Sequence, residues 1–369
     1  MPSRRRRLGH CATCHVRPRV MTFDPDHIAA SDSGIFGLPA AEAESLLHLI
    51  SVPWEVTTSY GDGASLGPAS ILRASRQVDL FDIETGEAYR NGYFMLPIPP
   101  EVLAWNKEFQ AKAKKVLREV TSGDEDSATV QGLQAEINAA SEKLNEWVYQ
   151  KAVKILEEER IAALIGGDHS TPYGLIRAIS EKFNGDFGIL HIDAHADLRE
   201  SFQGYKHSHA SIMYNVMKDL KPKTLVQVGV RDFSSDEYEY IKSSPMVATF
   251  FDSILKRRQH RGETWQSICD GIVARLPEQV YVSFDIDGLS PDLCPSTGTP
   301  VPGGLRFEEV LTLLATVVES GRRIIGFDLC EVAEGANSKS DWDGNVAARI
   351  LYKLCGWTVI SNGFERRRA

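Results

Sequence analysis

Long apolar segments are missing from this 369-residue chain: no run of about 18 apolar residues occurs, so no membrane-spanning helix is expected. Positive charge is in the minority, because 41 Lys and Arg residues face 50 Asp and Glu residues and leave a formal net charge of −9. This balance gives no reason to expect nucleic acid or an anionic membrane as a partner, whereas an acidic site suits a cationic substrate. The 43% hydrophobic and 25% charged residues are ordinary for a globular protein that buries a sizeable core.

Cysteine is scarce, with six residues in the whole chain. Four of them are isolated, in apolar contexts or beside candidate site residues: Cys269, Cys294, Cys330 and Cys355. No secretory signal is recognisable, so we expect reduced thiols in a cytoplasmic protein.

The first 35 residues lack hydrophobic periodicity, and we expect a disordered basic extension there. The C-x-x-C-H pattern of haem attachment occurs within it, at Cys11–His15. Haem attachment requires export in most settings, and the basic run Ser3–Arg7 is not followed by the apolar segment of a signal peptide. Residues 1–35 are therefore interpreted as an extension, or as translated sequence upstream of a true start at Met21, and residues 361–369 as a solvated tail.

Neither an internal repeat nor a low-complexity linker divides the remaining chain, and we expect one domain over residues 36–360. Long helices are predicted at 101–120 and 130–159, joined by a polar loop. Short apolar runs of strand length are found at 49–54, 162–165, 187–192, 224–230, 280–284 and 324–327. From about residue 160 onward, strands and helices alternate, which is typical of an α/β protein. The prediction is a single-domain three-layer α-β-α architecture with a mainly parallel sheet.

A glycine-rich loop, Tyr60–Pro68, has some likeness to a phosphate-binding loop. It lacks both the Gly-Lys-Ser/Thr ending and the Gly-x-Gly-x-x-Gly spacing of nucleotide sites. No nucleotide is therefore expected here, and Pro68 is predicted to open a helix over 69–78.

The most informative feature is a series of acidic and histidine clusters, at Gly166–Ser170, His191–Asp197 and Ser283–Gly288. In an extended segment, residues at i, i+2 and i+4 point to one side of the chain. The clusters supply six candidate metal ligands: His169, Asp193, His195, Asp197, Asp285 and Asp287. This number of nitrogen and oxygen ligands suits two divalent cations that share carboxylates, and hence metal-activated water and hydrolysis.

Polar residues of four predicted strands are expected at or just after the strand ends: His169, Asp193, Asp285 and Asp328. In open α/β sheets, ligands bind outside the carboxyl ends of the strands, so these side chains are expected in one crevice. His191 belongs to its strand and is predicted to be a core histidine that points away from the crevice.

These clusters resemble the three metal-binding motifs of the ureohydrolases, the family of arginases, agmatinases, guanidine hydrolases and formimidoylglutamases. The segments Thr297–Leu305 and Gly326–Glu331 are similar to the substrate-side motifs of that family. The resemblance covers about residues 45–357 and keeps the order of all five motifs.

The resemblance implies two cations, one held by His169, Asp193, Asp197 and Asp285, the other by His195, Asp193, Asp285 and Asp287. Asp193 and Asp285 would then bridge the two metals, which lower the pKa of a bridging water molecule. It further implies Mn²⁺ for arginases and agmatinases, Ni²⁺ for guanidine hydrolases, and a homo-oligomer, either trimer or hexamer.

The substrate implied is a small cationic guanidino compound, whose planar cation needs a carboxylate partner. Glu331 is predicted to bind it, with Asp328 either assisting or ordering the metal shell, and Thr299 as a further hydrogen-bonding group. His209 is expected to be the proton shuttle to the leaving nitrogen, although Ala210 follows it where the family usually has Gly. His209, Asp197 and Glu331 are therefore the predicted catalytic residues, and His207 is the competing candidate for the shuttle.

The substrate itself is left open. Leu198 follows Asp197 where arginases carry an Asn, which counts against arginine. Arg199 either binds a substrate carboxylate, as suits formimidoyl-glutamate, or pairs with a nearby acid, which is the favoured interpretation. The segment Asp82–Met95 resembles agmatinase-like guanidine hydrolases, and its aromatic residues are predicted to close the site over a small cation. The expected reaction is urea release from guanidine first, agmatine second. The alternatives are formimidoylglutamase or arginase activity and a non-enzymatic metal-binding protein.

Overall fold

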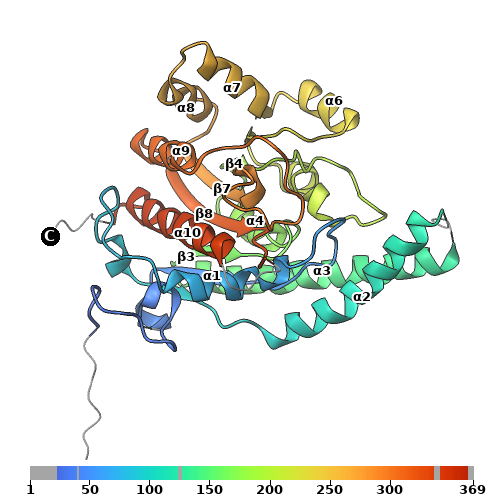
Figure 1. The fold of residues 1–369 in the computed structure, drawn as a ribbon, viewed down its shortest axis with the longest axis horizontal. Coiled ribbons are helices and arrows are strands. Elements are labelled where there is room, and N and C mark those ends of the chain that lie inside the picture. Colours follow the sequence, from blue (N-terminus) through green and yellow to red (C-terminus); the bar gives the residue numbers. More distant parts are fainter. Residues whose placement is uncertain (1–22, 40, 124–126, 336–340, 365–369) are drawn as a thin grey trace, which may run out of the picture.

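A computed structural model describes residues 23–39, 41–123, 127–335 and 341–364. Within them, one sheet has the strand order β2-β1-β3-β8-β7-β4-β5-β6, and every neighbouring pair is parallel. Figure 1 labels the four central strands, β3, β8, β7 and β4. Its strands are β1 Leu47–Ser51, β2 Tyr93–Met95, β3 Ile161–Ile165, β4 Gly188–Ile192, β5 Thr224–Val228, β6 Val247–Phe250, β7 Gln279–Asp285 and β8 Arg323–Cys330. The predicted α/β class is confirmed, and the sheet is wholly parallel in this part of the chain.

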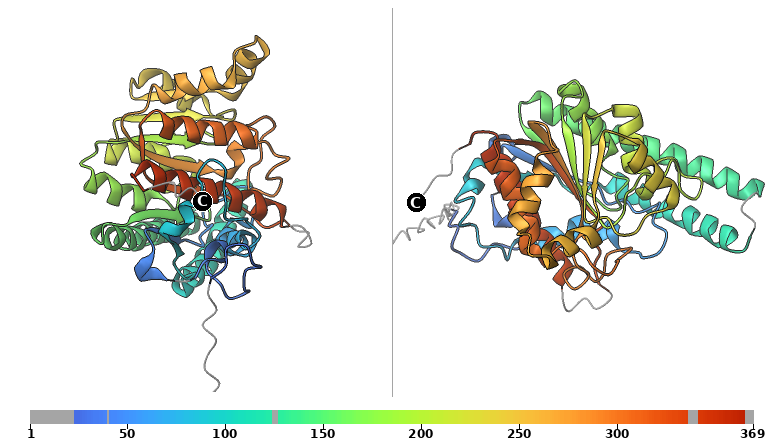
Figure 2. Two further views of the ribbon diagram at one scale, coloured as in Figure 1. Left: turned by 90° about the vertical axis from the view of Figure 1, so that its left-hand side faces the viewer. Right: turned by 90° about the horizontal axis from the view of Figure 1, so that it is seen from above.

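Helices cover both faces of the sheet (Figure 2). They are α1 Gly67–Ser75, α2 Pro100–Thr121, α3 Ala128–Glu157, α4 Tyr173–Lys182, α5 Ile212–Asn215, α6 Ser235–Ser243, α7 Asp252–His260, α8 Trp265–Val273, α9 Phe307–Glu319 and α10 Trp342–Ser361. Successive residues of a strand face opposite sides, so Leu190 packs with the side chains of α8, α9 and α10, whereas Ile189 packs with those of α3 and α4. Two apolar cores therefore hold the three layers together.

The predicted helices and central strands are present, with boundaries shifted by a few residues. Pro68 lies in the first turn of α1, as expected. The first strand was placed too late: β1 begins at Leu47 and ends before Pro53, which has no N–H to donate to a ladder. The edge strands β2 and β6 were missed because three or four residues are too few to show a period.

Strand β8 is longer than predicted, and this moves Asp328 away from the expected position. The strand continues to Cys330, so Asp328 lies inside it, fully buried, and Glu331 is the residue that follows the strand. The prediction that Asp328 follows the strand end is therefore wrong.

Three further expectations concern the whole chain. Cys269, Cys294, Cys330 and Cys355 are free, as predicted, and all four are buried. No helix among the described residues is long and apolar enough to cross a membrane. The haem-like segment Cys11–His15 and residues 365–369 lie outside the described residues.

Candidate metal centre

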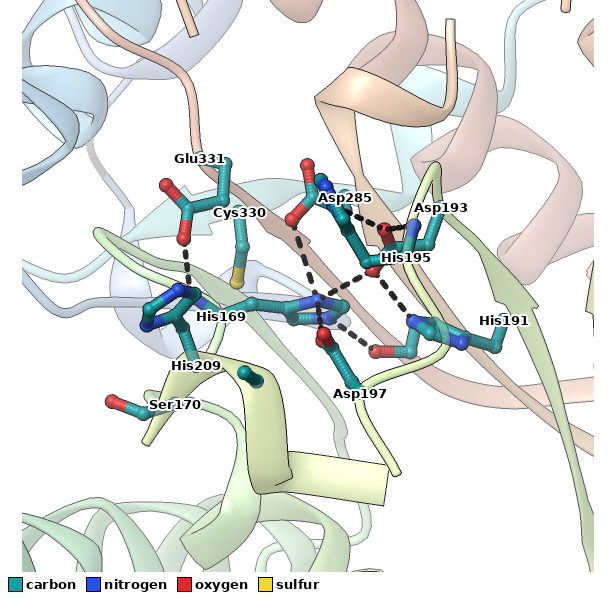
Figure 3. A network of polar contacts seen from close by, with 12 residues as sticks. His169, Ser170, His191, Asp193, His195, Asp197, His209, Asp285, Cys330 and Glu331 are labelled. Atoms are coloured by element: carbon teal, nitrogen blue, oxygen red, sulfur yellow. Dashed lines mark hydrogen bonds and ion pairs between the residues drawn. The ribbon is translucent and has the colours of Figure 1, made fainter. Parts of the chain in front are cut away.

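The predicted ligands converge at the carboxyl ends of the central strands. Three carboxylates surround one imidazole nitrogen: His169 Nδ1 lies 3.1 Å from Asp193 Oδ2, 3.1 Å from Asp197 Oδ2 and 3.4 Å from Asp285 Oδ2 (Figure 3). These residues come from the loops after β3 and β4 and from the end of β7. All four side chains are buried. A cation among them would be bound on several sides by nitrogen and oxygen atoms.

A second group of ligand atoms adjoins the first. His195 Nδ1 lies 3.0 Å from Asp287 Oδ2 and 3.5 Å from Asp193 Oδ1. The ligand atoms of these three residues lie within 4.8 Å of one another, and so do those of His169, His191, Asp193 and Asp197. Asp193 belongs to both groups, which is the arrangement expected of a carboxylate that bridges two cations.

The charge of this cluster fits divalent cations. Burial, followed by the neighbouring Asp287 and Asp193, raises the pKa of the Asp285 carboxyl well above its usual range. Burial opposes a charged His195, yet Asp287 and Asp193 raise the pKa of that imidazole to about 12. The negative charges of so many buried carboxylates are not balanced by the neighbouring side chains, and bound metal ions would balance them. Mixed imidazole and carboxylate ligands suit Mn²⁺ and are compatible with Ni²⁺.

Two site residues adopt the left-handed backbone conformation that side chains other than glycine rarely take. The φ angles are 54° at Asp197 and 62° at Glu331. Such a conformation costs about 1–3 kcal/mol and persists where surrounding structure enforces it, often at functional sites. It lets both carboxylates turn toward the cluster directly after a buried segment.

His191 is a core histidine, as predicted, but it does not point away from the site. Its Nε2 lies 2.8 Å from Asp193 Oδ2, and its Nδ1 lies 3.0 Å from Gln227 Nε2. Because the amide of Gln227 can only donate through Nε2, the His191 ring accepts at Nδ1 and donates from Nε2 to Asp193. The predicted orientation of His191 was wrong, since the ring orients a candidate bridging carboxylate.

Asp328 is placed beneath the cluster. It accepts hydrogen bonds from Tyr281 Oη at 2.7 Å and Ser283 Oγ at 3.1 Å, and lies 3.6 Å from His169 Nε2. This buried position favours the second of its two predicted roles, ordering the metal ligands, over contact with a substrate.

The predicted substrate-side groups line a recess beside the cluster. Glu331, Thr299 and His209 share the walls of this recess with the backbone of Gly298. Glu331 is buried, its Oε1 accepts the backbone N–H of His169 at 2.9 Å, and burial together with Asp168 raises the pKa of its carboxyl well above the usual range. A cation held there would favour the charged form of Glu331.

His209 is better placed than His207 for proton transfer. His209 lines the recess and also an adjoining open cavity of about 190 Å³. His195 and Asp197 line the same cavity. Burial, followed by the charge of His195, lowers the pKa of His209 to about 4. His207 is buried, and its ring packs on Tyr173 with centroids 5.0 Å apart rather than lining the cavity. The geometry favours His209, as the sequence did.

The rim of the cavity holds Arg199 together with residues that the sequence did not indicate. Arg199 Nε lies 3.5 Å from Glu237 Oε2, and its guanidinium group lies 4.7 Å from the ring of Phe202. It therefore pairs with an acid, as favoured. Asp232 and Phe233, both exposed, also line the cavity. They follow β5, and the sequence after this strand contains no metal-binding motif. The sequence therefore offers no indication that they belong to the site.

The aromatic residues of the segment Asp82–Met95 do not close the site. Tyr93 belongs to the edge strand β2 and packs against Phe36 and Tyr352 in the core. Tyr89 is also buried, with an edge contact to the ring of Phe23. The prediction that these rings lie over the substrate was wrong. Tyr60, from the glycine-rich loop, lines the recess instead and is largely exposed.

Comparisons with known proteins agree with this geometry. The family model described as "Arginase family" matches residues 46–356. The chain is 30% identical over 326 residues to an N(1)-aminopropylagmatine ureohydrolase of Thermus thermophilus, covering 88% of this chain and 94% of that protein. An agmatinase of Halalkalibacterium halodurans is 29% identical over 205 residues, covering 55% of this chain and 66% of that protein. A hypothetical agmatinase from Burkholderia thailandensis has the same fold, with a TM-score of 0.68, 22% identity, and coverage of 91% and 94%.

Proposed function

The chain belongs to the arginase family of ureohydrolases, hydrolases that act on linear amidines, and we propose that it releases urea from a small guanidino compound. The observation that carries this proposal is that Glu331, Thr299 and His209 lie beside the buried cluster of carboxylates and histidines. Glu331 Oε1 accepts the N–H of His169 at 2.9 Å, Thr299 Oγ1 lies 3.4 Å from Asp287 Oδ2, and His209 lines a cavity together with His195 and Asp197. A non-enzymatic relative would not need a buried carboxylate and a histidine on the substrate side of the metal ligands.

His169, Asp193, His195, Asp197, Asp285 and Asp287 would hold two divalent cations. When bound there, these would lower the pKa of a water molecule and supply hydroxide near neutral pH. Glu331 would hold the protonated guanidinium group by charge-assisted hydrogen bonds, and Thr299 would add a hydroxyl contact. His209 would deliver the proton that the leaving nitrogen gains as its bond to carbon breaks. The carbon gains oxygen, so the products are urea and an amine or ammonia.

The substrate we propose has no carboxylate. Arg199, a cationic group at the rim of the cavity, is already paired with Glu237, which disfavours formimidoyl-glutamate and arginine. Asp232 offers a carboxylate at the rim beside the ring of Phe233, which suits a cationic tail such as the amine of agmatine. Agmatine-type compounds therefore come first. Guanidine is the second candidate, because the groups of the recess would bind the guanidinium alone and would require no tail.

Urea release tests this function. The protein is loaded with Mn²⁺ or with Ni²⁺, and urea is measured with agmatine, aminopropylagmatine, guanidine, arginine and 4-guanidinobutyrate. We expect turnover of agmatine-type compounds or guanidine and little of arginine. If neither metal supports urea release from any of these substrates, the proposed function is wrong.

The choice between a tailed and a tailless substrate is tested at the rim. Changing Asp232 to Asn is expected to raise KM for agmatine about three- to tenfold, since an exposed ion pair contributes about 0.2–1 kcal/mol and a partly enclosed one somewhat more. The KM for guanidine is expected to stay unchanged. The control is Asp236→Asn, which alters an exposed carboxylate of α6. Equal effects on both substrates would contradict a role for Asp232 in binding a tail.

Metal identity, assembly and location are also proposed. We propose Mn²⁺ or Ni²⁺, a trimer or hexamer, and a cytoplasmic enzyme. Elemental analysis of the protein purified from its source, together with light scattering, would decide the first two.

A further inference from the structure

The segment that follows β1 packs directly against the loop that carries His169. Asp168 N donates to Trp54 O at 2.8 Å. The approach is so close that a Cβ on Gly167 would lie 1.9 Å from Trp54 O, which only glycine avoids. Residues 54–57 and 166–169 are therefore fixed relative to one another.

Thr57 and Asp168 meet at this contact. Both the N–H and the hydroxyl of Thr57 lie 3.1 Å from Asp168 Oδ2. The other oxygen, Oδ1, accepts from Ser170 N at 3.1 Å and from Ser170 Oγ at 2.5 Å. The carboxylate oxygen accepts from Thr57, so the single hydroxyl proton of Thr57 is directed at Asp168.

The lone pairs of the Thr57 hydroxyl are consequently left for His209. The oxygen accepts the backbone N–H of His209 at 3.0 Å and lies 3.5 Å from its ring Nδ1. Ser208 Oγ lies 3.3 Å from the same nitrogen. Thr57 therefore holds His209 through the backbone N–H, with its hydroxyl oxygen beside the ring Nδ1. Because Nδ1 faces Thr57 and Ser208, we assign proton exchange with a substrate to the opposite ring nitrogen, Nε2.

We propose that Thr57, oriented by Asp168, is a positioning residue for His209 that fixes the place of its ring. Thr57 acts through His209 and takes no part in metal binding. The inference rests on the proposed function, in which His209 transfers the proton to the leaving nitrogen. It extends the site to the segment that follows β1, to which none of the six predicted metal ligands belongs.

A double-mutant cycle tests the proposal, because Thr57→Val keeps the side-chain shape and removes the hydroxyl. We expect kcat to fall about 10- to 100-fold, as for other groups that orient a reacting residue, with KM and metal content unchanged. Thr57→Ser, which keeps the hydroxyl, is expected to stay within about threefold of the parent protein. In a His209→Asn background, Thr57→Val is expected to cost almost nothing more, since both changes remove one function.

The controls separate positioning from general stability. Thr316→Val removes a buried hydroxyl of α9 that is bonded to Thr312 O at 2.7 Å, and it is expected to leave kcat unchanged. Should thermal melting show that Thr57→Val does not fold, Thr57→Ala replaces it in the same cycle. Losses that add fully to those of His209→Asn, or a loss of bound metal, would overturn the inference while leaving the proposed function intact. Inactivity of the parent protein would instead count against the function.

Discussion

Asp193→Asn is expected to lower the urea-releasing activity by a factor of about 1,000 or more. This effect and that of a change at Glu331 are the largest that we expect. Among the described residues, Asp193 is the carboxylate shared by the His169 group and the His195 group of candidate ligand atoms. Its Oδ2 faces His169 and His191, while its Oδ1 accepts the N–H of His195 at 2.5 Å. An asparagine keeps the shape but offers one neutral oxygen where two charged ones stood.

The measurement that isolates this effect is metal binding rather than turnover. A ligand that binds only the folded state stabilises it by about 2.7 kcal/mol at a hundredfold excess over Kd. Added Mn²⁺ or Ni²⁺ is therefore expected to raise the melting temperature of the parent protein and to have little effect on the variant. Asp186→Asn, an exposed carboxylate just before β4 that pairs with Lys223, serves as the control. Two metal ions per chain in Asp193→Asn would refute the bridging assignment.

The central part of the fold was predictable because its signals are local. Strands such as β4 and β7 are short, largely apolar runs that lead into Asp193 and Asp287, and α3 is a helix of 30 residues, long enough for its pattern to be recognised. The edge strands carry no such signal. Only their pairing with β1 and β5 gives β2 and β6 their conformation, and that pairing joins distant parts of the chain.

The same distinction separates the site residues that could be predicted from those that could not. Asp193 and His195 lie in one short motif, so their spacing alone indicates a shared ligand role. The role of Thr57 depends on Asp168, 111 residues later, and on His209, 152 residues later. Likewise, the orientation of His191 is set by Gln227 on the neighbouring strand. Contacts between residues so far apart in the chain produce no recognisable motif in a single sequence.

The aromatic residues of the segment Asp82–Met95 show that a resemblance in sequence does not by itself locate side chains in the fold. Tyr89 and Tyr93 were expected over the substrate, yet both are buried in the apolar core near Phe36. An aromatic side chain buries much apolar area and is as well suited to a core as to a binding site. Its sequence neighbours do not distinguish the two, whereas the edge position of β2, distant from β7 and β4 in the sheet order, does.

Glu331→Gln is expected to lower kcat/KM for every guanidino substrate by roughly 100- to 1,000-fold or more. Removing one member of a buried, hydrogen-bonded charge pair costs about 3–5 kcal/mol, and each 1.36 kcal/mol is a factor of ten. Burial and the neighbouring Asp168 raise the pKa of this carboxyl, so its charge is stabilised only when a cation is bound beside it. Glutamine has the same shape and cannot supply that charge.

Glutamine also separates the two functions open to Glu331. Its side-chain oxygen can still accept the backbone N–H of His169, which lies 2.9 Å from Glu331 Oε1, so the metal ligands should keep their places. We therefore expect normal metal content and an unchanged metal-induced melting shift, in contrast to Asp193→Asn. Glu308→Gln, in the exposed first turn of α9, is the matched control. If turnover survives in Glu331→Gln, Glu331 serves only to hold the His169 loop, and the guanidinium must be bound by other groups of the recess.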